Sequence, residues 1–444
     1  MTQLRSAGCL LLILSLSVTV SADDAPPVQK YLTESRLQDG ATAMQSAIDA
    51  DSGDQQAQFS LGVIQFLQAI EGLGQDHYRY GLGSNRMPAI VFLRLPVPSN
   101  PAPERISYVA ARQILQNIVD RLATAERTLA KVTSADVKLP LPLEKICLDI
   151  NGDGKCGTEE SLGHIIDSIQ RRRRNRPDVQ EPGNLIVQFD VADAVWLRGY
   201  CRALSAMGEM ILAYDWSDQF ERTAHLLYPD VDTPFDYLND EGTGGLIGFG
   251  GQNILDLIAL VHMINYDLVE PERMPRALAH WEAVIQLSRE SWQLIQAEDD
   301  DANEWLPGPH QTPVITELRV GQELVTAWHE FLDEIESILL GEKLVPFWRG
   351  IPGGVNSVNV FPQHPTLGIN IRRVFTEPGR FDLALWLQGT GLQPWLEEGE
   401  IVDPADWNAM LRGFNNNFWP VFFWGSSDET VGNLQVTCDP GCQT

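Results

Sequence analysis

Residues 43–62, AMQSAIDADSGDQQAQFSLG, decide the fold class of this chain of 444 residues. Two stretches rich in Ala, Gln and apolar residues flank the polar break Asp49–Asp54, which contains a Ser-Gly pair of the kind found in turns. The flanking stretches extend the same character over residues 30–82. This pattern predicts two or three helices folded back on one another.

The residues around the break resemble a known helical repeat. Ala43, Ala47 and, after the break, Leu61-Gly62 occupy positions similar to the junction between two tetratricopeptide repeats, which are helical pairs of 34 residues. Gln65 stands where that motif prefers an aromatic residue. The resemblance covers one junction and implies helical hairpins in a solenoid-like arrangement. The order of segments also resembles uncharacterised exported bacterial proteins, a resemblance that implies no function.

Helical periodicity continues through the middle of the chain. Apolar residues recur three or four positions apart, which predicts amphipathic helices. These helices are expected at 114–129, 162–169, Ala192–Tyr214, Asn253–Val269, Pro275–Ala297 and Thr316–Gly341.

The character changes after Val345, where Pro, Gly, Asn and Trp become frequent. Val355–Val360 and Ile369–Val374 alternate with a period of two, which is typical of half-buried strands. The predicted fold class is mainly α, with helical hairpins, one calcium loop and a smaller mixed α/β C-terminal region. The expected units are a signal peptide at 1–22, an N-terminal helical region at 23–133, a calcium-loop module at 134–176, a central helical region at 177–344 and a Trp-rich region at 345–444.

The first residues have the layout of a secretory signal peptide. Arg5 precedes the apolar run Ala7–Val20, and the small residues Ser21 and Ala22 follow it. The run is shorter than the roughly 20 apolar residues that a membrane helix needs, and no later stretch is long and apolar enough. We therefore expect cleavage after Ala22, export to the periplasm or the medium, and no transmembrane segment after signal removal.

The charge of the chain limits its partners. It carries 32 basic and 60 acidic residues, for a formal net charge of −28. Nucleic acid is excluded as an expected partner, because binding it depends on a basic surface that neutralises phosphates. We expect a protein or an envelope polymer as partner. The basic run Arg171–Arg176 is interpreted as a solvated helix end, with an anionic envelope polymer as the alternative.

Residues 149–160, DINGDGKCGTEE, resemble the twelve-residue loop of an EF-hand. Such a loop surrounds Ca²⁺ with oxygens from positions 1, 3, 5, 7, 9 and 12, and it turns sharply at a glycine in position 6. Gly154 falls at that turn. The resemblance implies calcium as the cofactor and the ligands Asp149, Asn151, Asp153, Lys155 (through its carbonyl), Gly157 and Glu160.

Two features depart from the EF-hand pattern. Leu139–Leu143 contains two prolines and cannot be a regular incoming helix, and Cys156 replaces the branched apolar residue usual at position 8. We expect a strand or coil, then the loop, then a helix that starts near Thr158. The alternative is a metal-free turn rich in Asp and Asn. A single loop favours a structural role for calcium over switching, which opens a helix pair.

Five cysteines follow the signal peptide. In an oxidising compartment we expect the disulfides Cys147–Cys156 and Cys438–Cys442, which leave Cys201 as a buried thiol. A swapped pairing of Cys201 with Cys147 or Cys156 is the alternative.

No catalytic signature emerges from the chain. His329 and Asp333 share a predicted helical face, as do Asp218 and Glu221, but an acidic chain generates such pairs by chance. The leading hypothesis is an exported calcium-binding helical scaffold or binding protein. The alternative is a calcium-stabilised, all-α secreted hydrolase that cleaves carbohydrate through paired carboxylates.

Overall fold

The computed structural model describes residues 28–83, 90–166, 186–239, 252–312, 320–347 and 367–403. Several predicted features lie outside these residues, namely the signal peptide, Arg171–Arg176, Val355–Val360 and the pair Cys438 and Cys442. Within the described ranges, the chain is mainly helical and its sheets are small and antiparallel.

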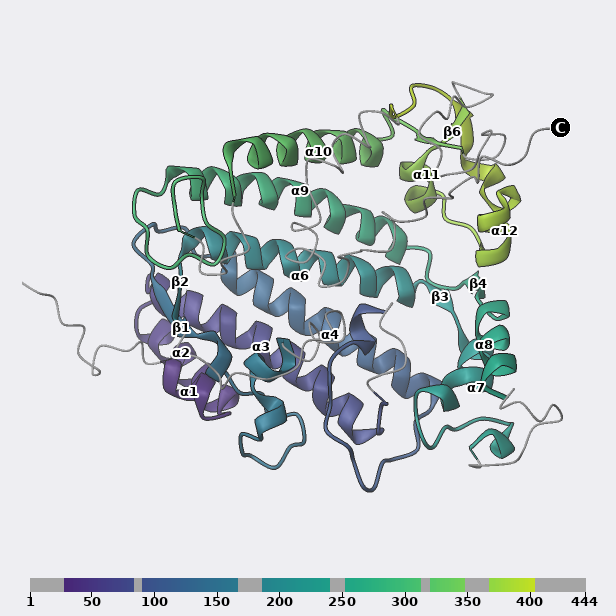
Figure 1. Cartoon of the computed structure of the whole chain (residues 1–444), viewed down its shortest axis with the longest axis horizontal. Coiled ribbons are helices and arrows are strands. Elements are labelled where there is room, and N and C mark those ends of the chain that lie inside the picture. Colours follow the sequence, from purple (N-terminus) through teal and green to yellow (C-terminus); the bar gives the residue numbers. More distant parts are fainter. Residues whose placement is uncertain are drawn as a thin grey trace, which may run out of the picture.

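Long helices packed side by side form the body of the molecule (Figure 1). Their spatial order is α3, α4, α6, α9 and α10, so each helix lies against its neighbours in that row. Their bounds are Gln55–Arg79, Tyr108–Leu129, Val191–Leu212, Arg273–Ala297 and Gln322–Leu340. The predictions for α6 and α9 agree with these bounds to within two residues.

The N-terminal hairpin forms as expected. Helices α1 (Gln29–Thr33) and α2 (Leu37–Ala50) precede α3, and α2 packs against it. The polar break lies between α2 and α3, where the Asp54 side chain accepts a hydrogen bond of 2.8 Å from the N–H of Ala57. This cap satisfies one of the free N–H groups at the start of α3.

Small sheets and short helices complete the fold. Strand β1 (Leu139–Pro142) pairs with β2 (Ile186–Phe189); β4 (Asn265–Leu268) lies between β3 (Tyr214–Asp215) and β7 (Phe381–Asp382); and β6 (Leu367–Ile369) lies between β5 (Val345–Pro346) and β8 (Leu396–Glu398). The short α-helices are α7 (Ser217–Thr223), α8 (Gln252–His262), α11 (Ile371–Thr376) and α12 (Leu383–Gln388). The 3₁₀ helices are η2 (Val91–Leu93), η3 (Leu143–Lys145), η4 (Thr158–Glu160), η5 (Ala224–Leu226), η6 (Asp236–Leu238) and η7 (Thr390–Trp395).

Two elements differ from the prediction in type, and helix α10 begins at Gln322, after the N-cap residue Gly321, instead of at Thr316. The expected strand Ile369–Val374 ends at Ile369, because the Asn370 side chain accepts a hydrogen bond of 3.0 Å from the N–H of Arg373 and caps helix α11. The expected helix Asn253–Val269 stops at His262, and the next residues form β4, which is paired on both edges. Residues 265–268 form a strand because they pair with strands that are distant in sequence, and local periodicity does not reveal such pairing.

Helix α6 separates the apolar cores. On one side it packs against α9, in a core around Trp292 to which α10 contributes, and on the other against α4, in a core around Ile118 and Leu122 to which α3 contributes. None of the described helices combines the length and apolar composition that crossing a bilayer requires.

Candidate functional site

In the first half of the loop 149–160, side chains accept hydrogen bonds from backbone N–H groups of residues that come later in the chain. Asn151 Oδ1 accepts from the N–H of Asp153, and Asp153 Oδ1 accepts from the N–H of Lys155, each at 2.8 Å. Asp149 Oδ2 accepts from the N–H of Gly154 at 3.1 Å. Gly154 has a φ of 73°, in the left-handed region that favours glycine. The backbone therefore curls around the side chains at positions 1, 3 and 5.

Glu160 closes the loop from its other end. Its Oε1 accepts a hydrogen bond from the N–H of Asn151 at 2.9 Å, and its Oε2 accepts from the N–H of Gly157 at 2.8 Å. The side chain is buried, with 1% of its surface exposed. In this conformation both of its oxygens therefore hold the backbone of the loop.

The donor set fits a hard dication, which prefers carboxylate, amide and carbonyl oxygens. Asp149 gives the most direct observation for this fit, because its Oδ1 is buried and accepts no hydrogen bond from any described residue. The three carboxylates of the loop are not gathered as closely as the acidic group described below, whose oxygens all lie within 4.8 Å of one another. Asp149, Asp153 and Glu160 are the carboxylates that would hold a cation in this loop.

The cysteine beside the loop pairs as predicted. Cys147 and Cys156 form a disulfide, which links the residue before Leu148 to position 8 of the loop. Cys201 is free and buried on α6, with 1% of its surface exposed. Burial raises the pKa of the Cys201 thiol above its ordinary value, so this side chain packs as a small apolar residue.

Helix α3 holds the start of the loop. Glu71 Oε2 accepts a hydrogen bond of 2.8 Å from the N–H of Asp149. Gln75 Nε2 donates a hydrogen bond of 2.8 Å to the carbonyl oxygen of Asp149. Burial raises the pKa of Glu71 to about 7, although the hydrogen bond from Asp149 opposes that rise. Both polar groups of the Asp149 backbone are thus fixed to one helix.

The two ends of the loop lie next to each other. The N–H of Leu148 donates to the carbonyl oxygen of Glu160 at 3.0 Å, and the N–H of Leu162 donates to that of Ile146 at 2.7 Å. Residues 162–166 are helical, but the outgoing helix does not start near Thr158 as predicted, because residues 158–160 form the 3₁₀ helix η4 and Ser161 is extended. The apolar side chains of Ile146, Leu148, Leu162 and Ile165 are thereby brought together on one surface.

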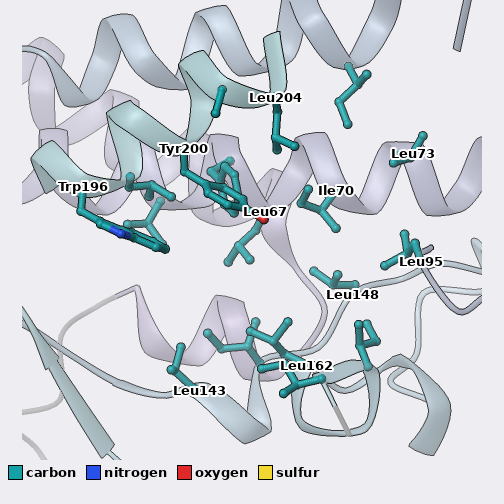
Figure 2. A pocket seen from close by; sticks show the side chains of 18 of the residues that line it. Leu67, Ile70, Leu73, Leu95, Leu143, Leu148, Leu162, Trp196, Tyr200 and Leu204 are labelled. Carbon is teal, nitrogen blue, oxygen red and sulfur yellow. The ribbon is translucent and has the colours of Figure 1, made fainter. Parts of the chain in front are cut away.

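That surface forms one wall of an apolar cavity of about 410 Å³. Figure 2 shows Leu143, Leu148 and Leu162 on one side of the open space, with residues of α3 and α6 on the other. The α3 residues of the lining are Phe59, Val63, Phe66, Leu67, Ile70 and Leu73, and the α6 residues include Trp196, Leu197, Tyr200, Ala203, Leu204 and Met207. The volume falls within the roughly 300–1,000 Å³ that small-molecule sites occupy.

Few polar groups reach the cavity lining. Arg94 and Asp193 are the charged residues of the described lining, and Tyr200 and Trp305 add a hydroxyl and an indole N–H. Burial raises the pKa of Tyr200 to about 12, and the nearby charge of Arg94 opposes this rise. Among the described residues, no acceptor reaches the buried Nε1 of Trp305. An occupant of this cavity would be largely apolar, with room for one polar end.

A group of acidic side chains lies beside the cavity residues Asp193 and Trp305. Asp190, Glu298 and Glu304 each contribute one carboxylate oxygen, and these oxygens lie within 4.8 Å of one another. Burial is the main cause that raises the pKa values of Glu298 and Glu304 to about 7 each, and the Asp190 carboxylate adds to both rises. Local sequence patterns do not reveal this group, since its members are far apart in the chain.

The acidic pairs considered for catalysis are otherwise engaged. Asp333 lies 2.6 Å from Arg289, and His329 Nδ1 lies 2.9 Å from the carbonyl oxygen of Val325 in its own helix. Asp218 is exposed and paired with Arg222 at 2.7 Å. The spacing within each pair places its two residues on one helical face. Among the described residues, neither pair lines a shared cleft.

No protein-family model matches the chain, and neither a curated protein nor a solved structure matches it.

Proposed function

We propose that this chain is an exported, calcium-stabilised helical protein that binds a small apolar molecule in the cavity between α3, α6 and the loop module. The single observation that carries the proposal is the cavity itself, which is lined almost entirely by apolar side chains. Sites for small molecules are typically concave and apolar, with a few placed polar groups. Calcium is assigned a structural role, because its loop joins the two segments that form one wall.

Arg94 suggests the chemistry of the occupant. An arginine on an otherwise apolar lining can bind an anionic end, such as a carboxylate, by hydrogen bonds that carry charge. Asp193 adds no positive charge to the lining, and its Oδ2 accepts a hydrogen bond of 3.0 Å from the N–H of Asp190. The proposed ligand is therefore an amphiphile with a slender apolar body and an acidic head, for example a fatty acid.

The hydrolase alternative has no specific observation in its favour. Glycoside cleavage requires two carboxyl groups that flank the bond to be broken. Within the described residues, the lining of the cavity includes one carboxyl group, that of Asp193.

A fluorescent fatty acid tests the proposal. Chain lacking residues 1–22 should bind a dansyl-labelled fatty acid saturably, with one site, and unlabelled fatty acid should displace it. Ala203→Phe places a ring in the cavity and should abolish binding. Val109→Phe adds the same ring at a side chain that is 74% exposed, so it should leave the affinity unchanged.

A second pair of measurements tests the head group. Arg94→Gln should weaken binding of the fatty acid about tenfold, which corresponds to about 1.4 kcal/mol, and should leave the affinity for the matching fatty alcohol unaltered. Absence of saturable binding to the wild-type chain, or equal binding to Ala203→Phe, would overturn the assignment of the cavity.

A further inference from the structure

The acidic group at Asp190, Glu298 and Glu304 joins parts of the chain that are distant in sequence. Asp190 is the N-cap residue of α6, Glu298 directly follows α9, and Glu304 belongs to the segment that contacts Gln188 of β2. The beginning of one central helix and the end of another therefore meet at these three carboxylates.

Two of these three side chains are buried, and Glu298 is partly exposed. Asp190 is 3% exposed and Glu304 is 2% exposed. Buried carboxylates of like charge repel one another, and in proteins such groups are paired with cations, protonated or bound to metals. The charge of the group therefore requires compensation.

Among the described residues, Lys138 is the cation that pairs with the group. Its Nζ is 3.2 Å from Asp190 Oδ2, and the same atom is 3.2 Å from Asp300 Oδ2, outside the group. One ammonium group thus serves two carboxylates, and neither is Glu298 or Glu304. The positive charge available from Lys138 does not balance the three acidic side chains.

The three carboxylates of the group differ in whether their oxygens accept hydrogen bonds. Asp190 Oδ1 accepts from the N–H of Ala192 at 2.8 Å, and Glu298 Oε2 accepts from Gln311 Nε2 at 2.9 Å. Glu304 Oε1, in contrast, is buried and has no partner among the described residues. An unpartnered carboxylate oxygen in the interior costs free energy, which a bound cation would offset.

The spacing suits an ion. Two oxygens that each bind Ca²⁺ at about 2.3–2.6 Å can be at most about 5 Å apart, and the oxygens of the group lie within 4.8 Å of one another. Ligands made only of carboxylates select hard ions such as Ca²⁺, Mn²⁺ and Mg²⁺ over softer metals. We propose that Asp190, Glu298 and Glu304 bind one hard divalent cation, which ties the start of α6 to the end of α9 independently of the loop 149–160.

Terbium luminescence offers a direct test, since Tb³⁺ replaces Ca²⁺ and emits when a nearby indole transfers energy to it. Trp305 follows Glu304 in the chain and provides that indole. The experiment uses metal-stripped chain lacking residues 1–22, with Asp149→Asn and Asp153→Asn to disable the loop. We expect a saturable terbium signal at one equivalent that Ca²⁺ displaces. Trp305→Phe should reduce the emission and leave calorimetric Ca²⁺ binding intact.

Substitutions in the same background assign the ligands. Glu304→Gln should lower the terbium affinity by at least about tenfold, since even residues that only support a metal ligand contribute about that much. Asp300→Asn removes a neighbouring charge that contacts the same lysine but supplies no oxygen to the group, so it should lower the affinity much less than Glu304→Gln does. Circular dichroism verifies folding, and Glu298→Gln replaces Glu304→Gln if that variant is unfolded.

Two results would overturn the proposal. One is the absence of saturable binding of Tb³⁺ or Ca²⁺ up to millimolar concentration, which would mean that protons compensate the charge. The other is equal affinity in the Glu304→Gln, Glu298→Gln and Asp300→Asn variants. Neither result bears on the cavity, which fatty-acid binding tests separately.

Discussion

The carboxylate of Glu71 accepts a hydrogen bond of 2.8 Å from the backbone N–H of Asp149, so α3 and the first residue of the loop 149–160 are held together. The same helix supplies Leu67, Ile70 and Leu73 to the opposite side of the cavity. The loop and the cavity therefore share a support, and damage to one should be measurable at the other.

The Glu71 contact yields the first prediction. Glu71→Ala leaves the N–H of Asp149 without its acceptor, which should cost about 1–3 kcal/mol of unfolding free energy. Glu71→Gln retains an acceptor oxygen at the same position and should cost less. Urea unfolding of both variants provides the measurement, and equal losses would show that the charge of Glu71, not its hydrogen bond, supports the loop.

Calcium should stabilise the fold. For an affinity near 10 μM, intermediate among such loops, millimolar calcium is about a hundredfold above the dissociation constant and should add about 2.7 kcal/mol. Thermal melts of metal-stripped protein should shift upward with Ca²⁺ and less with Mg²⁺, which gives up its water reluctantly. Identical melts with and without calcium, together with a flat calorimetric titration, would remove the assignment.

Asp153→Asn is a better variant for the calcium test than a change at Glu160. Glu160 accepts hydrogen bonds at both oxygens, so its replacement by Gln disturbs the loop even without metal. Asp153→Asn removes one charge and keeps the acceptor for the N–H of Lys155. Asp51→Asn is a matched control, since Asp51 makes the same kind of turn with Gly53 at 2.9 Å outside the loop. Only Asp153→Asn should reduce the calcium response.

Thiol chemistry gives a further prediction. With Cys147 joined to Cys156, and with the predicted pair Cys438–Cys442, Cys201 is the remaining thiol. Its burial and raised pKa should prevent reaction with a thiol reagent at neutral pH until the protein is denatured. One reactive thiol per chain is then expected. Rapid labelling of the native protein, or a second thiol after denaturation, would contradict this assignment.

His77 should make the fold sensitive to acid. Burial lowers the pKa of His77 to about 4 from an ordinary value of 6.5, against the hydrogen bond to Phe92 that favours the charged form. Below pH 6.5 the unfolded chain therefore binds a proton that the folded chain does not bind until about pH 4. Above pH 6.5 the titration of His77 does not affect the free energy of unfolding. As the pH falls from 6.5 to about 4, this free energy decreases by about 3 kcal/mol in total.

His77→Gln isolates this effect. Nε2 of His77 lies 2.7 Å from the carbonyl oxygen of Phe92, a residue of the cavity lining, and Gln offers an N–H for the same bond without titrating. Urea unfolding at about pH 7 and about pH 5 should show a smaller loss for the variant, because the carboxyl groups titrate alike in both proteins. Equal losses would mean that His77 is accessible to protons in the folded state.

Local patterns predicted the helical body because those helices carry their own signals. The apolar periods of α6 and α9, the N-cap residue Asp190 of α6 and the oxygens of the loop 149–160 all lie in short stretches of consecutive residues. The cavity escaped prediction because Ile70 and Leu148 look like ordinary core residues in sequence. Only the packing of the two helices against the loop module shows that they face open space. The group at Asp190, Glu298 and Glu304 depends likewise on tertiary contacts.

The disulfide next to the loop has a consequence for the timing of assembly. Cys147 and Cys156 enclose Asp149 and Asp153, so formation of the bond shortens the chain segment that must order around a cation. A newly made chain in a reducing, calcium-poor cytoplasm would lack both constraints, and the wall containing Leu148 and Leu162 would be unfinished. Under the proposed function, the chain would bind its ligand only after export. It would therefore not bind lipids in the cytoplasm.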